Sequence, residues 1–135
     1  MRWNILIGGK AGQGINTVTV IIAGVLTNYG YYVFNYRDYQ SLIRGGHNFN
    51  ILSISDKKIG SFESKLNCII ALDENTLKLH KSKLLKQGFI LDYSQFEDLG
   101  KDANVALASA LISILGVPKE YILKAVKEFK TDSSL

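Results

Sequence analysis

The first third of the chain shows apolar spacing that changes from strand-like to helical and back again. Trp3 to Ile7 is a short apolar run closed by Gly8 and Gly9, which predicts a buried strand. Apolar side chains then recur at the helical period, at positions 15, 18, 22, 25, 26 and 29. Gly30 is expected to end that helix, and the alternation from Tyr31 to Tyr36 predicts a second strand. Together these elements predict a βαβ unit, with two parallel neighbouring strands joined by a right-handed crossover.

The middle of the chain combines a long polar stretch with a second alternating run. The polar and aromatic stretch from Asn35 to Asn50 has no clear period and is predicted to be a loop. Loops of this length inside a compact domain are usually functional or mobile. The alternating run from Phe49 to Ser55 predicts a strand, and "DKK" after it predicts a turn into a short strand around Ile59 to Phe62. This region is therefore expected to add an antiparallel hairpin.

The second half predicts two more strands and a long apolar helix. "LNCIIAL", Leu66 to Leu72, is an apolar run typical of a fully buried strand. Asp73 is expected to cap a helix that reaches about Lys86, and Gly88 to Tyr93 predicts another strand. Ala103 to Leu115 is apolar nearly all round, so we expect a helix that is deeply buried or lies in an interface.

The last elements complete an α/β pattern. Gly116 is expected to stop the apolar helix and Pro118 to open the final one, whose inward stripe is Ile122, Val126 and Phe129. The fold class predicted is α/β, with a mainly parallel Rossmann-like sheet, helices on both faces and a small antiparallel hairpin excursion. We expect a single domain over residues 1–130 and a tail over residues 131–135.

Composition narrows the class of protein. The 135 residues are 47% hydrophobic and 21% charged, which is typical of a globular chain. A single cysteine, Cys68, excludes an internal disulfide, a cysteine-rich zinc site and a self-contained iron–sulfur cluster. Its place in an apolar run predicts a thiol that acts as a small hydrophobe. The first apolar run is too short for a signal peptide, and the stretch from Val105 to Val117 is interrupted by polar residues and glycine, so we expect a cytoplasmic protein without a membrane span.

Charge adds little to this picture. The formal net charge is +4 and the isoelectric point is near 9.1. Lys78, Lys81, Lys83 and Lys86 fall toward the end of the predicted helix, where cations suit the helix dipole. A solvated helix face is therefore favoured over a nucleic-acid patch, and no helix-turn-helix spacing or aromatic RNA-binding motif accompanies these lysines. We expect no nucleic-acid partner.

Four glycines lie between the first strand and the first helix, in "LIGGKAGQGI" from Leu6 to Ile15. The dinucleotide-binding pattern G-x-G-x-x-G fails at Thr17, where its third glycine would stand. The P-loop pattern G-x-x-x-x-G-K-[ST] fails at Ile15 and Asn16, which replace its lysine and hydroxyl residue. Two alternatives remain open. In the first, bare N–H groups at the helix N-terminus bind an anion, most often a phosphate. In the second, the glycines only permit a tight turn and close packing of the strand and the helix.

A second candidate feature is "SLIRGGHN", Ser41 to Asn48. Arg44 offers a rigid fork of donors suited to phosphate or carboxylate, and Gly45 allows a sharp turn beside it. Loops that follow parallel strands gather at one edge of a sheet, so we expect this loop and the glycine loop to lie side by side. A surface salt bridge or a contact with a partner chain is the alternative role for Arg44. His47 is expected to be structural, and His80, on a lysine-rich helix face, to be solvated.

No catalytic set is visible in the sequence. It holds no G-x-S-x-G elbow and no histidine, cysteine and carboxylate spacing typical of a metal site. Five tyrosines between positions 29 and 39 are expected to pack in the core or in an interface. The chain is therefore predicted to be a binding domain whose chemistry is supplied elsewhere.

Three segments carry a resemblance to a known family: "NILIGGKAGQGI", "GYYVFNYRDYQSLIRGGHNFNILSIS" and "IIALDENTL". With them the chain resembles the gamma subunit or domain of the 2-oxoacid:ferredoxin (acceptor) oxidoreductases. The form "YRDYQSLIRGGHN" is most similar to the version often fused ahead of the alpha part, and "NVALASALISILGVPKEYILKAVKEF" resembles the closing helices of that family. The resemblance covers nearly the whole chain, and AGQG combined with RGGHN is quite specific.

The resemblance implies a role within a larger enzyme. The complete enzyme decarboxylates a 2-oxoacid on thiamine diphosphate, passes electrons through iron–sulfur clusters to ferredoxin and releases acyl-CoA. Thiamine diphosphate and the clusters would be held by alpha and beta partner subunits, or by a delta or ferredoxin-like one, and this chain would be inactive alone. It would help to bind coenzyme A and to hold the assembly together, and a dimer of the chain is compatible with that role. The implied phosphate-facing residues are Gly9, Ala11, Gly12, Gln13 and Gly14, with Arg44 as the side-chain contact and Gly45 beside it.

Two further hypotheses stay open: a stand-alone domain that binds a phosphate ester or nucleotide, and a purely structural subunit. The chain also departs from the family pattern. Only Lys101 to Ala103 stand where the family usually carries a longer stretch, and the chain stops soon after Phe129 with no alpha part following. We therefore expect a separate gamma subunit, one domain of a gamma–alpha fusion, or a shortened relative.

Overall fold

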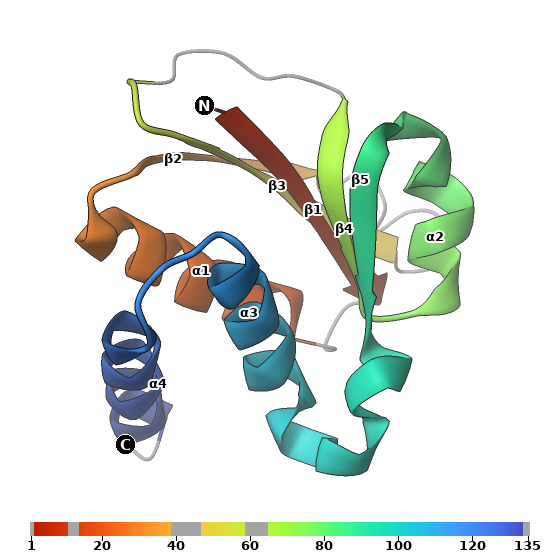
Figure 1. Cartoon of the computed structure of the whole chain (residues 1–135). Coiled ribbons are helices and arrows are strands. Elements are labelled where there is room, and N and C mark those ends of the chain that lie inside the picture. The colour runs from red at the N-terminus through yellow and green to blue at the C-terminus, as the bar shows by residue number, and fades with distance from the viewer. Residues whose placement is uncertain (1, 11–13, 39–46, 59–64, 134–135) are drawn as a thin grey trace.

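The computed structural model describes residues 2–10, 14–38, 47–58 and 65–133 (Figure 1). Within these ranges, strands and helices alternate along most of the chain, as the apolar spacing predicts. In chain order the elements are β1 (Arg2–Lys10), α1 (Ile15–Tyr29), β2 (Tyr32–Asp38), β3 (His47–Ser55), β4 (Leu66–Ala71), α2 (Glu74–His80), the 3₁₀ turn η2 (Lys81–Lys83), β5 (Leu84–Asp92), the 3₁₀ segment η3 (Tyr93–Asp102), α3 (Ala103–Ile114) and α4 (Lys119–Ser133).

The five strands form one mixed sheet in the order β2-β3-β1-β4-β5. β1, β4 and β5 are parallel, whereas β3 runs antiparallel to both of its neighbours, β1 and β2. The prediction that β1 and β2 are neighbours was therefore wrong. They run in the same direction, but β3 lies between them.

The predicted α/β class is confirmed, but the sheet is mixed rather than mainly parallel, because β3 runs antiparallel between β1 and β2. β3 is a nine-residue strand whose second half, from Asn50 to Ser55, is fully buried, so it stands inside the sheet as a full neighbour of β1. Its strand-like alternation is local and says nothing of where the strand inserts. The short strand expected around residues 59–62 lies outside the described residues.

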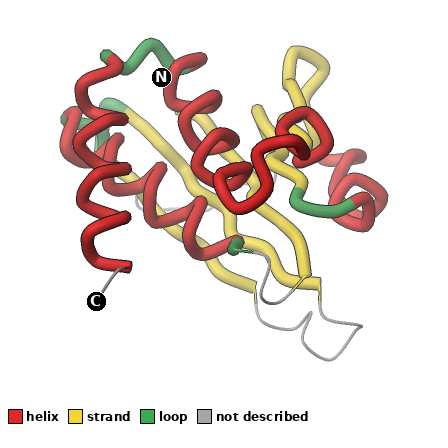
Figure 2. Tube along the Cα trace, turned by 90° about the horizontal axis from the view of Figure 1, so that it is seen from below, coloured by secondary structure: helices red, strands yellow, loops and turns green. Residues whose placement is uncertain are grey.

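Helices cover both faces of the sheet, as predicted (Figures 1 and 2). Alternate strand residues face opposite layers: Ile5 and Ile7 pack in the larger core with α1 and α3, and Leu6 packs in the smaller one with Leu77 of α2. α4 adds Ile122 to the larger core. No helix among the described residues is long and apolar enough to cross a membrane.

Most predicted helix ends are confirmed. Gly30, at φ +113°, closes α1 with its N–H on the carbonyls of Leu26 and Thr27, and Gly116 is left-handed after α3. The Asp73 carboxylate accepts a hydrogen bond of 3.0 Å from the Thr76 N–H, which caps α2.

The predicted end of α2 near Lys86 was wrong. The helix stops at His80, and Leu84 already begins β5, opposite Leu66 of β4. The residues from Leu84 onward pair with the buried strand β4 instead of continuing the helix, although the spacing of the lysines is helical. Lys83 and Lys86 therefore lie outside α2. Lys86 lies on β5, an edge strand of the sheet, and Lys83 lies in the 3₁₀ turn before it.

Candidate functional site

The glycine loop joins β1 to the first turn of α1. Gly14 is the N-cap of α1 at φ +93°, and a Cβ there would overlap the side-chain amide of Asn104 at the start of α3. α1 has no side-chain cap and no acidic residue in its first turn. Its positive dipole end is therefore uncompensated by these means, which is the condition that favours a bound anion. The predicted residues Ala11, Gly12 and Gln13 lie outside the described residues.

Two glycines of this region, Gly8 and Gly9, lie inside β1. Gly9 is buried and pairs with Asn48 of β3. A Cβ on Gly8 would lie 2.7 Å from Cγ2 of Thr76, so a bare backbone is needed for α2 to approach the sheet. Close packing, one of the two alternatives raised by the sequence, therefore accounts for Gly8, while Gly14 sits at the helix N-terminus.

The described residues on either side of Arg44, Asp38 and His47, lie at the same end of the strands as the glycine loop. Arg44 and Gly45 lie outside the described residues, but β3 begins at His47, and His47 pairs with Lys10, the last residue of β1. β2 also ends here, because Asp38 pairs with Phe49. The ends of both candidate loops are thus brought together, as predicted, although β3 rather than a parallel β2 is the neighbour of β1.

A buried amide network fixes the start of α1 against β3. The Nδ2 group of Asn50 donates to Oδ1 of Asn16 at 3.1 Å and to Oγ1 of Thr19 at 2.9 Å. The Thr19 hydroxyl in turn donates to the Ile15 carbonyl at 2.8 Å. Sequence reasoning missed this network, although the alternation of β3 puts Asn50 on the same face as Leu52, which packs in the core with α1.

A buried histidine pair lies on the other face of the sheet. The Nε2 atoms of His47 and His80 are 2.9 Å apart, and the Phe49 ring meets the His80 ring edge-to-face at 4.5 Å. Only one hydrogen can lie between the two nitrogens, so one ring donates and the other accepts. His47 is buried, as a structural role requires.

The prediction of a solvated His80 was wrong, because this side chain is only 6% exposed. Its place on the buried side of α2, four residues after the buried Thr76, could have revealed this.

Other candidate groups do not form a chemical centre. Cys68 is fully buried in β4, and burial raises the pKa of its thiol, so it behaves as the predicted small hydrophobe. Among the described residues, no group of three or more histidine, cysteine or acidic side chains could hold a metal ion.

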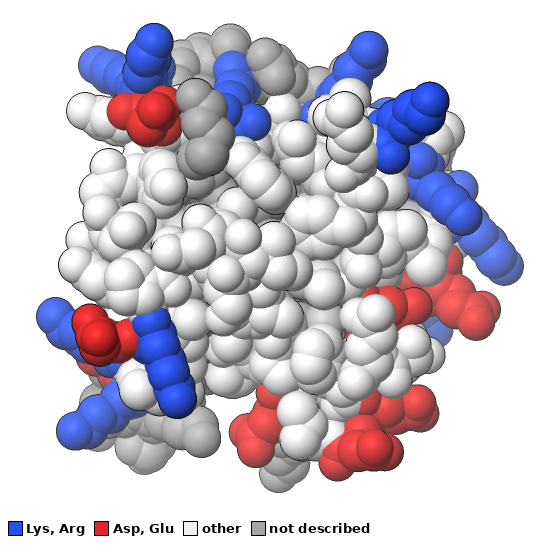
Figure 3. Space-filling view, in the orientation of Figure 1, with Lys and Arg blue, Asp and Glu red and all other residues white. Residues whose placement is uncertain are grey.

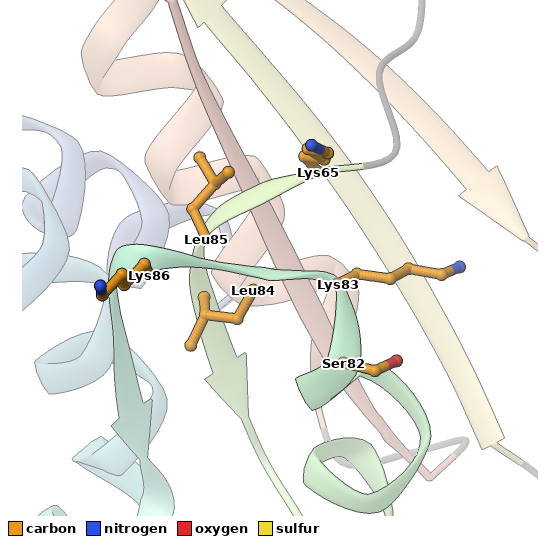
Figure 4. Close-up of a pocket in the computed structure, with 6 residues that line it drawn as sticks. All are labelled: Lys65, Ser82, Lys83, Leu84, Leu85 and Lys86. Carbon is orange, nitrogen blue, oxygen red and sulfur yellow. The ribbon is translucent and has the colours of Figure 1, made fainter.

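Charge is unevenly spread over the surface. Figure 3 shows many Lys and Arg side chains at the end of the molecule where β1 begins and a further group at the lower left, while most Asp and Glu side chains lie at the lower right. Two surface cavities of about 430 Å³ are found away from the described ends of the glycine loop. One lies along α1 beside Asn35 of β2, and the other is lined by Lys65 and residues 82–86 (Figure 4).

Comparison with known families gives one match over nearly the whole chain. Residues 4–132 match the family model described as pyruvate ferredoxin/flavodoxin oxidoreductase. Over 80 residues the chain is 38% identical to a 2-oxoacid:ferredoxin oxidoreductase subunit alpha from a Sulfolobus species and 34% identical to one from Saccharolobus solfataricus. Each alignment covers 59% of this chain and 13% of the relative, so the chain spans a small part of the length of these curated relatives.

Solved structures share the fold. A 2-oxoglutarate:ferredoxin oxidoreductase from Magnetococcus marinus, solved with 2-oxoglutarate, coenzyme A and succinyl-CoA bound, superimposes with a TM-score of 0.77 at 16% identity, over 98% of this chain and 27% of that one. The gamma subunit of a keto/oxoacid ferredoxin oxidoreductase from Geobacter sulfurreducens PCA gives 0.75 at 24% identity, over 93% of this chain and 83% of that one. At these identities the similarity concerns the fold alone.

Proposed function

The chain belongs to the pyruvate ferredoxin/flavodoxin oxidoreductase family, and from this we propose that it is the gamma subunit or domain of a 2-oxoacid:ferredoxin oxidoreductase. The complete enzyme would convert a 2-oxoacid, coenzyme A and oxidised ferredoxin to acyl-CoA, carbon dioxide and reduced ferredoxin. This chain would contribute the binding of coenzyme A and the assembly of the complex, and would be inactive alone. The shared fold with a solved gamma subunit, over 83% of that chain, supports this role.

The pairing of Lys10 with His47 carries the coenzyme A part of the proposal. It puts the end of the glycine loop next to the strand that begins three residues after Arg44. The N-terminus of α1 has no side-chain cap, which favours a bound phosphate there. Gly14 has no side chain that would block the approach of the phosphate to the backbone. Residues 9, 11–14, 44 and 45 are the proposed contacts to the phosphates. A protein of the same fold is known with coenzyme A bound, which is consistent with this ligand.

Coenzyme A supplies the thiol that accepts the acyl group, and this chain's own residues would hold its phosphate end. We assign thiamine diphosphate and the iron–sulfur clusters to partner subunits. The sequence offers one cysteine, which is buried, and a cluster needs several thiolate ligands. Positioning a co-substrate is thus the contribution expected of this chain.

An exposed aromatic row supports contact with a partner. Tyr32, Phe34 and Tyr36 alternate along β2, so they share one face of this edge strand, and they are 51%, 37% and 40% exposed. Exposed edge strands with apolar side chains are templates for pairing with other chains. We propose that β2 contributes to assembly with the other subunits.

Co-purification tests this function directly. A tagged chain expressed in its native cells should elute together with a subunit that binds thiamine diphosphate and with a subunit that carries iron–sulfur clusters. A stand-alone phosphate-ester domain would elute by itself and still bind its ligand. A purely structural subunit would co-elute, but Arg44→Ala would leave the activity of the complex unchanged.

A further inference from the structure

Lysines from three separate segments meet at the edge of the sheet opposite the glycine loop. β3 ends where β1 begins, with Ser55 opposite Arg2, and β4 and β5 begin here with Leu66 opposite Leu84. The side chains that this topology collects are all exposed, and we call them the basic edge: Lys57, Lys58, Lys65, Lys83 and Lys86. In Figure 3 many Lys and Arg side chains lie at this end of the molecule.

The exposed carboxylate of Asp56 directly precedes Lys57 and Lys58 in the chain. A single carboxylate offsets only part of the charge of five lysines. The five lysines therefore carry an excess of positive charge. Neither burial nor pairing with other described residues offsets this excess.

An apolar centre lies among these lysines. Lys65, Ser82, Lys83, Leu84, Leu85 and Lys86 line a surface cavity of about 430 Å³ (Figure 4). Leu85 is 37% exposed. In Figure 4 its side chain points toward Lys65, while Lys83 and Lys86 point to opposite sides of the cavity.

This geometry favours one kind of ligand. Ammonium groups that diverge cannot converge on one small anion, so an isolated phosphate is a poor fit. Nucleic acid is disfavoured because leucines, and not aromatic rings on which bases could stack, stand between the cations. An apolar centre with a charged rim is the usual anatomy of a protein interface.

Protection of a strand edge does not explain the whole pattern. Lysines and bulges on edge strands prevent unwanted pairing, and β5 has both: Lys86 and the irregular register between Leu84 and Phe89. Lys57, Lys58 and Lys65, however, flank β3 and β4, which are inner strands with no edge to protect. A second role is needed for them.

We propose that the basic edge is a docking surface for an acidic region of a partner protein, with an apolar side chain of that partner seated against Leu85. The surface lies at the opposite ends of the strands from the glycine loop, so both can be occupied at once. This inference goes beyond the proposed function and does not depend on coenzyme A binding.

Fluorescence anisotropy of the full chain tests the proposal, with a labelled glutamate-rich peptide that has one central leucine. Lys83→Glu/Lys86→Glu should weaken binding about tenfold or more, because two attractive charges become repulsive. The matched control Lys119→Glu/Lys124→Glu makes the same charge change at exposed positions of α4 and should leave most of the affinity. Leu85→Ser should weaken binding of this peptide but not of one in which alanine replaces the leucine.

Three results would overturn the proposal: no binding of the peptide, equal losses in the two double variants, or tighter binding of duplex DNA of equal charge. Equal losses would mean that only net charge matters. Tighter DNA binding would assign the basic edge to nucleic acid. Circular dichroism checks that each variant is folded, which is expected because all four lysines are exposed.

Discussion

The two ends of the strands are built in different ways. At the glycine-loop end, the features that matter belong to the backbone and the interior: the left-handed Gly14, the buried Asn50 network and the close approach at Gly8. At the basic edge, they belong to long exposed side chains on Lys65, Lys83 and neighbouring positions. The difference teaches that the proposed binding site, which is made of backbone, cannot be changed without affecting folding, whereas a surface made of lysines can.

The largest effect is expected at Gly14. Gly14→Ala should lower the free energy of unfolding by about 2–4 kcal/mol, because alanine is strained at φ +93° and its Cβ would overlap Asn104. Urea unfolding measures this loss. Gly24→Ala is the matched control, since Gly24 is inside α1 with no atom near its missing Cβ, and it should be stabilising by about 0.5–1 kcal/mol. Similar values for the two variants would contradict the account of Gly14.

A smaller loss is expected when the amide network is broken. Asn50→Ala removes both hydrogen bonds that its Nδ2 group donates to α1, and should cost about 1–3 kcal/mol. A double-mutant cycle with Thr19→Val separates the pair from other effects. Coupling near zero would show that Asn50 does not hold α1 through Thr19.

The smallest effect concerns the reactivity of the Cys68 thiol. Cys68 lies in β4, between the two ends of the strands, so its reactivity reports on the sheet itself. Burial shields this thiol and raises its pKa, so it stays protonated and should not react with thiol reagents in the native protein at mildly alkaline pH. Gly14→Ala should speed the reaction in proportion to its loss of stability. Lys83→Glu/Lys86→Glu should leave it unchanged. Rapid labelling of the last variant would show that the basic edge is coupled to folding.

Local signals in the sequence predicted much of the fold. The helix ends at Gly30 and Gly116 and the cap at Asp73 depend on residues a few positions apart, and all three are observed. The place of β3 between β1 and β2 depends on pairing between residues far apart along the chain, as the pairing of Arg2 with Ser55 illustrates, and alternation carries no such information.

The candidate site was predicted in the same partial way. The glycine loop and Arg44 were singled out because clustered glycines, and an arginine next to two glycines, stand out in a sequence, and their role in binding stays a prediction. The Asn50 network and the His47–His80 pair were missed, because each joins two elements that are distant along the chain. Polar residues on a core-facing position of a strand or helix would have been the signal to follow.

The most direct test of the central claim is a calorimetric titration of the full chain with coenzyme A and, separately, with pantetheine, which has the thiol arm but no phosphate. The account predicts micromolar binding of coenzyme A, on the order of −8 kcal/mol, with no heat from pantetheine and a clear weakening in Arg44→Ala. Lys83→Ala, which removes one charge at the basic edge, should bind coenzyme A as the unaltered chain does. Equal heats from the two ligands, or a coenzyme A affinity that Arg44→Ala leaves unchanged, would contradict phosphate binding at the glycine loop.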